Sequence, residues 1–146
     1  MVLSDGDRIR NVLGSYCDLV DAGDHAGVGA LFGDDGVLAA EDGTVIARGR
    51  AAIADFYART TKRHEGSPRT KHVLANTVLE PGEDGSVTAR SSFLVLQATA
   101  GLPLQPIITG RYVDRFEPDG VDGWSWAERR FAAELVGHLG HHLEQL

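Results

Sequence analysis

The stretch RTKHVLANTVLE, residues 69–80, separates a helix-rich first part of the chain from a series of strands. Its β-branched and apolar residues, followed by Pro81-Gly82, predict a strand that ends in a turn. One face of this strand would carry His72, Leu74, Asn76 and Val78. Both faces are largely apolar, so we expect the strand to be covered on both sides and His72 to be shielded from water.

The residues before this strand predict three helices and a hairpin. The first helix is indicated by apolar residues at helical spacing, namely Ile9, Val12, Leu13, Tyr16, Cys17 and Val20. A short second helix is expected after Asp24, whose side chain suits an N-cap. An Asp-Gly pair marks a hairpin within residues 36–49, and the third helix has Phe56 and Tyr57 on one face.

The residues after it predict three further strands, within 86–97, 106–117 and 124–135. Turns rich in Gly, Pro and Asp join them, which favours an antiparallel meander. Helices first and strands later indicate an α+β fold in which one sheet face packs on the helices. The length fits a single domain, residues 1–146, with a C-terminal tail over about residues 137–146.

The composition, with 42% hydrophobic and 24% charged residues, is that of a globular protein. The net charge of −7 argues against a nucleic-acid partner, which would need a basic surface. The N-terminus lacks the apolar run of a signal peptide, and the longest uncharged run, residues 91–110, is interrupted by Pro and Gly. We therefore expect a cytoplasmic protein with no membrane partner, and the single Cys17 fits a reducing compartment.

His72 and Asp21 are the first candidates for a functional site. Asp21 borders the buried stripe near the end of the first helix, where an acidic residue is slightly unfavourable. From the residues alone, His72 is either a core histidine hydrogen-bonded to a neighbour or a proton-transfer group. Asp21 is either a solvated residue at the helix end or the partner of such a group.

The last two strands supply further candidates. Tyr112 and Asp114 share a strand face and are expected to line one interior. In residues 124–135, either Arg129 or Arg130 must face the more buried side, where an arginine holds an oxyanion or a carboxylate. The alternative for that arginine is an exterior salt bridge.

The tail GHLGHHLEQL, residues 137–146, allows a metal-site interpretation. On a helix, His138 with His141 or His142 could share a face as ligands, with Glu144 nearby. No second cluster in the sequence completes such a site. The prediction is therefore that no metal is bound and that the tail packs or frays.

Several short blocks of the sequence form a recognisable set, namely SYCDLVDAGDHAGVGALFGDDGVL, GRAAIADFY, TKHVLANTVLE, GRYVDRFEPDG and WSWAERRF. Together they resemble the SnoaL-like family of the nuclear-transport-factor-like superfamily, and the similarity extends from about Arg8 to His142. Relatives include polyketide cyclases, scytalone dehydratase, bile-acid dehydratases and hexachlorocyclohexane dehydrochlorinase. The resemblance implies a cone-shaped α+β barrel, in which three N-terminal helices pack on a curved, mostly antiparallel sheet that encloses a pocket.

The resemblance also implies site residues. In the eliminating relatives an Asp late in the first helix pairs with a His that opens the third strand, and these positions match Asp21 and His72. Bile-acid dehydratases have a tyrosine five residues before this Asp, which matches Tyr16, and the arginine of the dehydrochlorinase best matches Arg129. The second histidine and second tyrosine of scytalone dehydratase have no definite match. Several relatives work without a cofactor and these folds commonly dimerise, so we expect no cofactor and a homodimer here.

We therefore predict a cofactor-independent lyase or isomerase that acts on a hydrophobic, polycyclic or polyketide-derived small molecule. His72 would be the general base, oriented by Asp21, in a dehydration, an isomerisation or an aldol-type cyclisation. Arg129 would be the third catalytic residue, and the substrate-binding residues would be Tyr16, Asn76, Phe56, Tyr112 and Trp126. The alternative is a non-catalytic binding or assembly module, because this fold alone does not determine a function.

Overall fold

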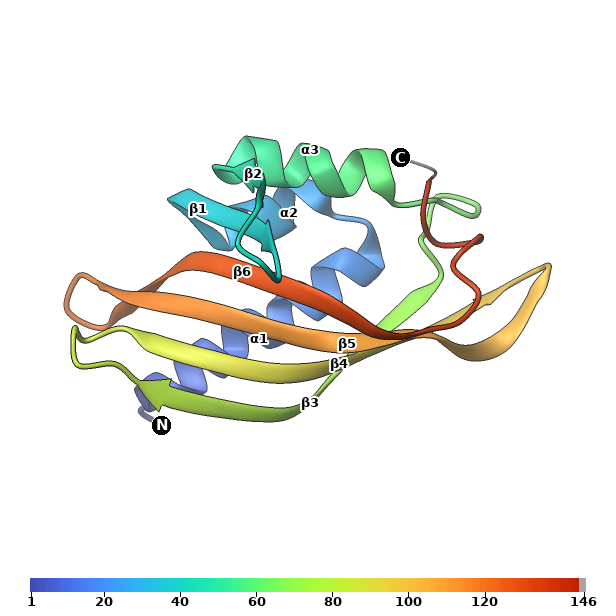
Figure 1. The fold of residues 1–146 in the computed structure, drawn as a ribbon. Coiled ribbons are helices and arrows are strands. Elements are labelled where there is room, and N and C mark those ends of the chain that lie inside the picture. The colour runs from blue at the N-terminus through green and yellow to red at the C-terminus, as the bar shows by residue number, and fades with distance from the viewer. Residues whose placement is uncertain (145–146) are drawn as a thin grey trace.

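The computed structural model describes residues 1–144 of the chain. In that range three helices, α1 (Asp5–Ala22), α2 (His25–Ala30) and α3 (Arg50–Thr60), accompany six strands. The strands are β1 (Phe32–Ala40), β2 (Val45–Arg48), β3 (Thr70–Pro81), β4 (Val87–Thr99), β5 (Leu102–Asp119) and β6 (Gly123–Val136). The predicted α+β class is confirmed, with the helices gathered against a long, bent sheet (Figure 1).

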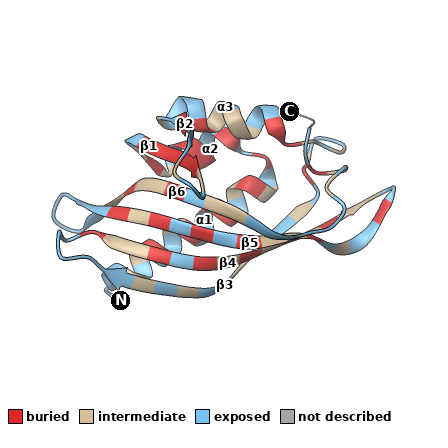
Figure 2. Ribbon diagram, in the orientation of Figure 1, coloured by how far each residue is buried: buried red, intermediate tan, exposed pale blue. Residues whose placement is uncertain are grey.

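The sheet has the strand order β2-β1-β6-β5-β4-β3. Strands β3 to β6 form the antiparallel meander that the sequence predicts, and buried residues alternate with less buried ones along β4 and β5 (Figure 2). Strand β6 also pairs with β1, in parallel, which joins the N-terminal hairpin to the meander. Because β2 and β3 are the two edges, the sheet is open and the cone is not a closed barrel.

Helix α1 forms as the sequence predicts. Ser4 caps it in a reciprocal capping box with Asp7, and Gly23 ends it in the left-handed conformation, with a φ of 73°. Its buried face packs against β3, so that the last turn of α1 lies beside the start of that strand. None of the helices within residues 1–144 combines the length and the apolar character that crossing a bilayer requires.

The outer face of β3 is exposed in the single chain, so the expectation that this strand is covered on both sides is wrong. Val73 and Val78 keep 37% and 48% of their surface exposed. The helices pack only on the inner face, and β3 is an edge strand. An apolar sequence on both faces therefore did not mean burial on both faces.

A bulge in β3 moves Asn76 away from the face predicted for it. The register with β4 shifts between Ala75 and Val78, and Asn76 has a φ of 53°. Strict alternation predicts that Asn76 shares the buried face of His72, but Asn76 is exposed. The prediction fails because the extra residue of a bulge interrupts the two-residue period of a strand.

A second bulge, in β6, brings Trp126 and Arg129 to the same side. Two successive residues of β5 pair with Trp126 and Glu128, which leaves Ala127 as the extra residue. Alternation predicts Trp126 and Arg129 on opposite faces, but both are 0% exposed. Of the two candidate arginines, Arg129 therefore faces the interior, whereas Arg130 is exposed.

Candidate active site

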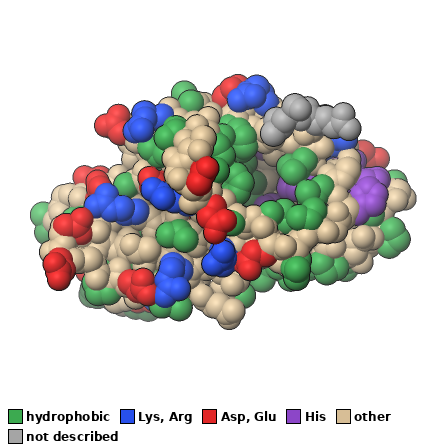
Figure 3. Space-filling view, in the orientation of Figure 1, with side chains coloured by type: hydrophobic (Ala, Val, Ile, Leu, Met, Phe, Trp, Pro, Cys, Tyr) green, Lys and Arg blue, Asp and Glu red, His purple; other side chains and the backbone are tan. Residues whose placement is uncertain are grey.

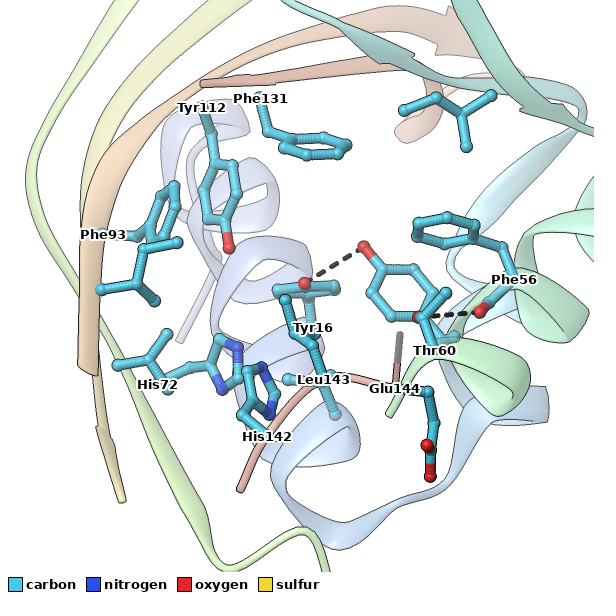
Figure 4. A pocket seen from close by; sticks show the side chains of 15 residues that line it. Tyr16, Phe56, Thr60, His72, Phe93, Tyr112, Phe131, His142, Leu143 and Glu144 are labelled. Atoms are coloured by element: carbon cyan, nitrogen blue, oxygen red, sulfur yellow. Dashed lines mark hydrogen bonds between the residues drawn. The ribbon is translucent and has the colours of Figure 1, made fainter. Parts of the chain in front are cut away.

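A cavity of about 380 Å³ lies between the inner face of the sheet, helices α1 and α3, and the C-terminal tail (Figure 4). The space-filling view is hollowed near α3, among hydrophobic and histidine side chains (Figure 3). Six aromatic side chains in the described residues contribute to the lining, namely Tyr16, Phe56, Tyr57, Phe93, Tyr112 and Phe131. Such a volume and such a lining are typical of sites for small organic molecules.

The predicted contact between Asp21 and His72 is present at one end of this cavity. The Asp21 carboxylate lies 2.6 Å from Nδ1 of His72 and also accepts a hydrogen bond of 2.8 Å from the His72 backbone N–H. The hydroxyl of Thr70 donates to the same carboxylate at 2.9 Å. Three groups of β3 thus hold one side chain of α1, which fixes the orientation of the imidazole.

These contacts set the proton positions in the pair. Burial alone would raise the pKa of Asp21, but the hydrogen bonds and the charge interaction with His72, together with the bond from Thr70, outweigh it and leave the pKa below its ordinary value. An ionised carboxylate only accepts hydrogen bonds, so Nδ1 of His72 carries a proton towards Asp21. In the neutral imidazole, Nε2 is then left with a free lone pair. His72 itself lines the cavity.

Two tyrosine hydroxyls meet beside this pair. The hydroxyl of Tyr16 lies 3.1 Å from the hydroxyl of Tyr57, and the ring of Tyr16 contacts that of His72 edge to face, with centroids 6.2 Å apart (Figure 4). Burial raises the pKa of both tyrosines, so both stay protonated near neutral pH. Since one hydroxyl donates to the other, the pair retains one hydroxyl proton for another acceptor.

The C-terminal tail contributes His142 to the same end of the cavity. Its side chain is buried, lines the cavity, and lies with its ring centroid 6.1 Å from that of His72. Leu143 and Glu144 follow it along the lining. The tail therefore packs, and it forms part of the cavity wall.

A comparison with models of protein families gives a match over most of the chain. Residues 1–130 match the model of the SnoaL-like domain. The chain belongs to this family. A comparison with curated protein sequences gives no match.

Solved structures share the fold of this SnoaL-like domain. A variant of Rv3472, a protein of unknown function from Mycobacterium tuberculosis, is 26% identical, with a TM-score of 0.70 over 87% of this chain and 70% of that chain. An NTF2-like protein with a cystatin-like fold from Novosphingobium aromaticivorans is 24% identical, with a TM-score of 0.71 over 88% and 81% of the two chains. A candidate scytalone dehydratase from the same organism is 18% identical, with a TM-score of 0.69 over 90% and 85%.

Arg129 lies behind the cavity of this SnoaL-like domain and outside the lining formed by residues 1–144. Its guanidinium donates two hydrogen bonds to Asp114, at 2.8 and 3.0 Å, and stacks over the ring of Tyr112 at 3.5 Å and that of Tyr16 at 4.3 Å. The rings of Tyr16 and Tyr112 therefore lie between Arg129 and the cavity. The sequence predicted an arginine on the buried side, but it could not show that aromatic rings separate this arginine from the cavity.

The predicted substrate-binding residues divide into two groups. Tyr16, Phe56 and Tyr112 line the cavity as expected. Asn76 and Trp126 do not contribute to the lining formed by the described residues. Asn76 lies exposed in its bulge, and the buried Trp126 stacks on Phe32 at a centroid distance of 4.0 Å.

Sequence reasoning missed the positions of Tyr57 and His142. The sequence pattern predicts that Tyr57 shares a helix face with Phe56, an expected substrate-binding residue, and this shared face is the available signal for Tyr57. For His142 the sequence offers only the possible role of a metal ligand in the tail. Among residues 1–144, no three His, Cys, Asp or Glu side chains are grouped as a metal site requires.

Proposed function

We propose that this SnoaL-like protein is an enzyme that removes a proton from a carbon next to an electron-withdrawing group of a hydrophobic small molecule. Dehydration, isomerisation and aldol-type cyclisation all begin with this step. The observation that supports the proposal is the Asp21–His72 pair, in which the oriented imidazole lines an apolar cavity large enough for a ligand.

His72 is the general base of the proposed reaction. Its Nε2 takes the proton, and the electron pair of the broken C–H bond moves into the adjacent carbonyl to form an enolate. The imidazolium that results is stabilised by the carboxylate of Asp21 at 2.6 Å. The same imidazolium then returns its proton, either to a leaving hydroxyl, which departs as water, or to another carbon, which completes an isomerisation.

The Tyr16–Tyr57 pair supplies a second donor. Its spare hydroxyl proton can be donated to an oxygen on which negative charge develops, and such a donor is worth more in a water-poor cavity than in solution. Arg129 supports this role from behind, since its positive charge opposes the effect of burial on the pKa of both hydroxyls.

The cavity suits a substrate with an aromatic or polycyclic body and a polar end. The imidazoles and the tyrosine hydroxyls are gathered near one another, while the remainder of the lining is largely formed by Val20, Ile46, Phe93, Val95, Ile108 and Phe131. A ligand therefore gains from burying apolar surface and satisfies its few polar atoms beside His72.

The second candidate function is a binding module without turnover, in which Asp21 and His72 form a structural pair. A measurement of deuterium uptake separates the two functions. Bicyclic and polycyclic ketones, with and without hydroxyl groups, are incubated with the protein in D₂O and followed by mass spectrometry for deuterium gain and product. Exchange or turnover by the wild type supports the enzyme.

The variants that test the pair are His72→Ala and Asp21→Asn. Loss of the base is expected to slow the reaction about a thousandfold. Asp18→Asn is the matched control, because Asp18 lies on the same helix and is exposed. Unchanged rates in both His72→Ala and Asp21→Asn would show that the pair does not carry the chemistry.

A further inference from the structure

The tail is held in place by contacts with two distant parts of the chain. The backbone N–H of Lys62 donates to the carbonyl of His142 at 2.8 Å, and that of Glu144 donates to the carbonyl of Thr60 at 2.9 Å. The side-chain amide of the buried Gln97 donates to the preceding carbonyl of the tail at 3.0 Å. His142 is thus placed from both sides, by the end of α3 and by β4.

The imidazole of His142 has unused hydrogen-bonding capacity. It is 8% exposed, and its Nδ1 is buried with no hydrogen-bond partner in residues 1–144. A buried polar group without a partner costs about 1–3 kcal/mol. The tail therefore holds this imidazole in the cavity lining at a cost in stability. Because Nδ1 is enclosed by the protein, the ring nitrogen left for a ligand in the cavity is Nε2.

The surroundings also determine the charge of this imidazole. Burial, and then the proximity of His72, lower the pKa of His142 to about 4, although the charge of Asp21 acts in the opposite direction. At neutral pH the ring is uncharged, with one N–H donor and one lone pair. A neutral imidazole can donate its N–H to a carbonyl oxygen and so polarise the carbonyl group, while the C–H proton of the substrate goes to another base.

We propose that His142 binds the carbonyl oxygen of the substrate while His72 removes the proton from the adjacent carbon. This assignment rests on the proposed function and adds to it the residue that recognises the oxygen. The C–H bond breaks, its electron pair forms the C=C bond of an enolate, and the carbonyl π pair moves onto oxygen. The proton goes to Nε2 of His72, and Nε2–H of His142 donates a hydrogen bond to the enolate oxygen and keeps its own proton.

In a dehydration, the Tyr16–Tyr57 pair then hydrogen-bonds the leaving oxygen, which receives its proton from the imidazolium of His72. The two imidazoles have ring centroids 6.1 Å apart, so one small ligand can contact both. A bicyclic aryl ketone places an acidic C–H one carbon from its carbonyl and buries its ring system among the aromatic side chains of the lining. The inferred substrate class is therefore an enolisable ketone attached to an apolar ring system.

The test uses 1-tetralone, a bicyclic aryl ketone, and the hydrocarbon tetralin, which lacks the oxygen. Affinities are measured by calorimetry for the wild type, His142→Ala and His138→Ala. His138 is the matched control, because it lies in the same tail and is exposed. We expect His142→Ala to weaken the binding of 1-tetralone about tenfold, the effect of one lost hydrogen bond. Tetralin binding should change less than about twofold, since tetralin makes no hydrogen bond.

Infrared spectroscopy of 1-tetralone labelled with ¹³C at its carbonyl reports the contact directly. Binding to the wild type and to His138→Ala should shift the carbonyl stretch to lower frequency, and His142→Ala should remove the shift. A shift that persists in His142→Ala but disappears in Tyr57→Phe would assign the oxygen to the tyrosines and overturn the inference. Failure of the wild type to bind 1-tetralone, or an equal loss of affinity for tetralin, would overturn it as well.

These measurements need no turnover, so they separate the two proposals. If His72→Ala abolishes deuterium exchange while His142→Ala leaves the carbonyl band unchanged, the proposed function stands and the role of His142 is wrong. If the carbonyl band depends on His142 but neither the wild type nor any variant exchanges deuterium, His142 binds the carbonyl oxygen and the proposed proton removal is wrong.

Discussion

The Asp21–His72 pair and the Asp114–Arg129 pair are both contacts between a carboxylate and a basic side chain, but they have different surroundings. Asp21 and His72 keep 14% and 7% of their side-chain surface exposed, and His72 lines the cavity, whereas Asp114 and Arg129 keep none exposed. Burial raises the pKa of Asp114 in spite of Arg129, while hydrogen bonding outweighs burial at Asp21 and lowers its pKa. Access to the cavity therefore separates a pair suited to proton transfer from a pair suited to holding the core.

The largest effect on stability is expected from Arg129→Ala. This change leaves the carboxylate of Asp114 buried without its partner, which typically costs about 3–5 kcal/mol. Chemical denaturation measures the loss in the free energy of unfolding. Arg130→Ala is the control, since Arg130 pairs with Glu128 on the surface and such pairs contribute at most about 1 kcal/mol. Equal losses of unfolding free energy in Arg129→Ala and Arg130→Ala would show that the buried pair contributes no more to stability than the surface pair.

The opposite pattern is expected for Asp21→Asn. A neutral amide cannot stabilise the imidazolium of His72, so we expect the exchange rate to fall about a thousandfold. The free energy of unfolding should fall by about 1–3 kcal/mol, less than in Arg129→Ala, because the amide nitrogen cannot accept a hydrogen bond that one carboxylate oxygen accepts. Deuterium uptake and denaturation are measured on the same preparation. A variant that loses stability as severely as Arg129→Ala would show that this pair, too, is structural.

The stability of the protein should depend on pH through His142. Its pKa is about 4 in the folded protein and 6.5 in the unfolded chain, so between these values the unfolded chain binds a proton that the folded protein does not. The part of the free energy of unfolding that depends on His142 is fully present above pH 6.5. As the pH falls towards 4 this part is lost, and the loss is at most about 3 kcal/mol. Denaturation of wild type and His142→Gln from pH 7 to pH 4 should show a steeper decline for the wild type. Parallel declines would contradict this assignment.

The smallest effect is expected from Tyr57→Phe. The change removes one hydroxyl of the pair and leaves Tyr16 without the contact at 3.1 Å, so we expect about a tenfold loss of activity. The pH–rate profile should keep its shape, because the base is unchanged. Phe56→Leu, in the same part of α3, is the control for packing alone and should affect the affinity for substrate more than the rate. A larger rate loss in Phe56→Leu would argue against the hydroxyl pair.

Much of the fold was predictable from local pattern. The stripe on α1, the capping residue Asp24 and the four strands of the meander follow from periodicity, capping preference and turn residues, and the structure confirms them. The predicted contact between Asp21 and His72 is also present. It came from the resemblance to a family, because nothing local to either residue indicates the other across some fifty positions.

The errors at Asn76 and Trp126 share one physical cause. A single extra residue in β3 and another in β6 changed which faces carry Asn76 and Trp126, and a bulge leaves no reliable mark in a two-residue alternation. His142 was unpredictable for a related reason. Its position depends on hydrogen bonds to Thr60, Lys62 and Gln97, which are contacts between segments that are distant in sequence.

The sequence by itself determined the elements, their order and the residue types available for chemistry, because capping, periodicity and turn preference act within a few residues. The tertiary structure alone decided which of those residues share the cavity and which are hidden behind it. Burial and proximity across the fold assign His72 and His142 to one wall, with Asp21 bonded to His72, and Arg129 to the core. Burial and proximity depend on how distant segments of the chain pack together, and the pKa of each group depends on that packing as well.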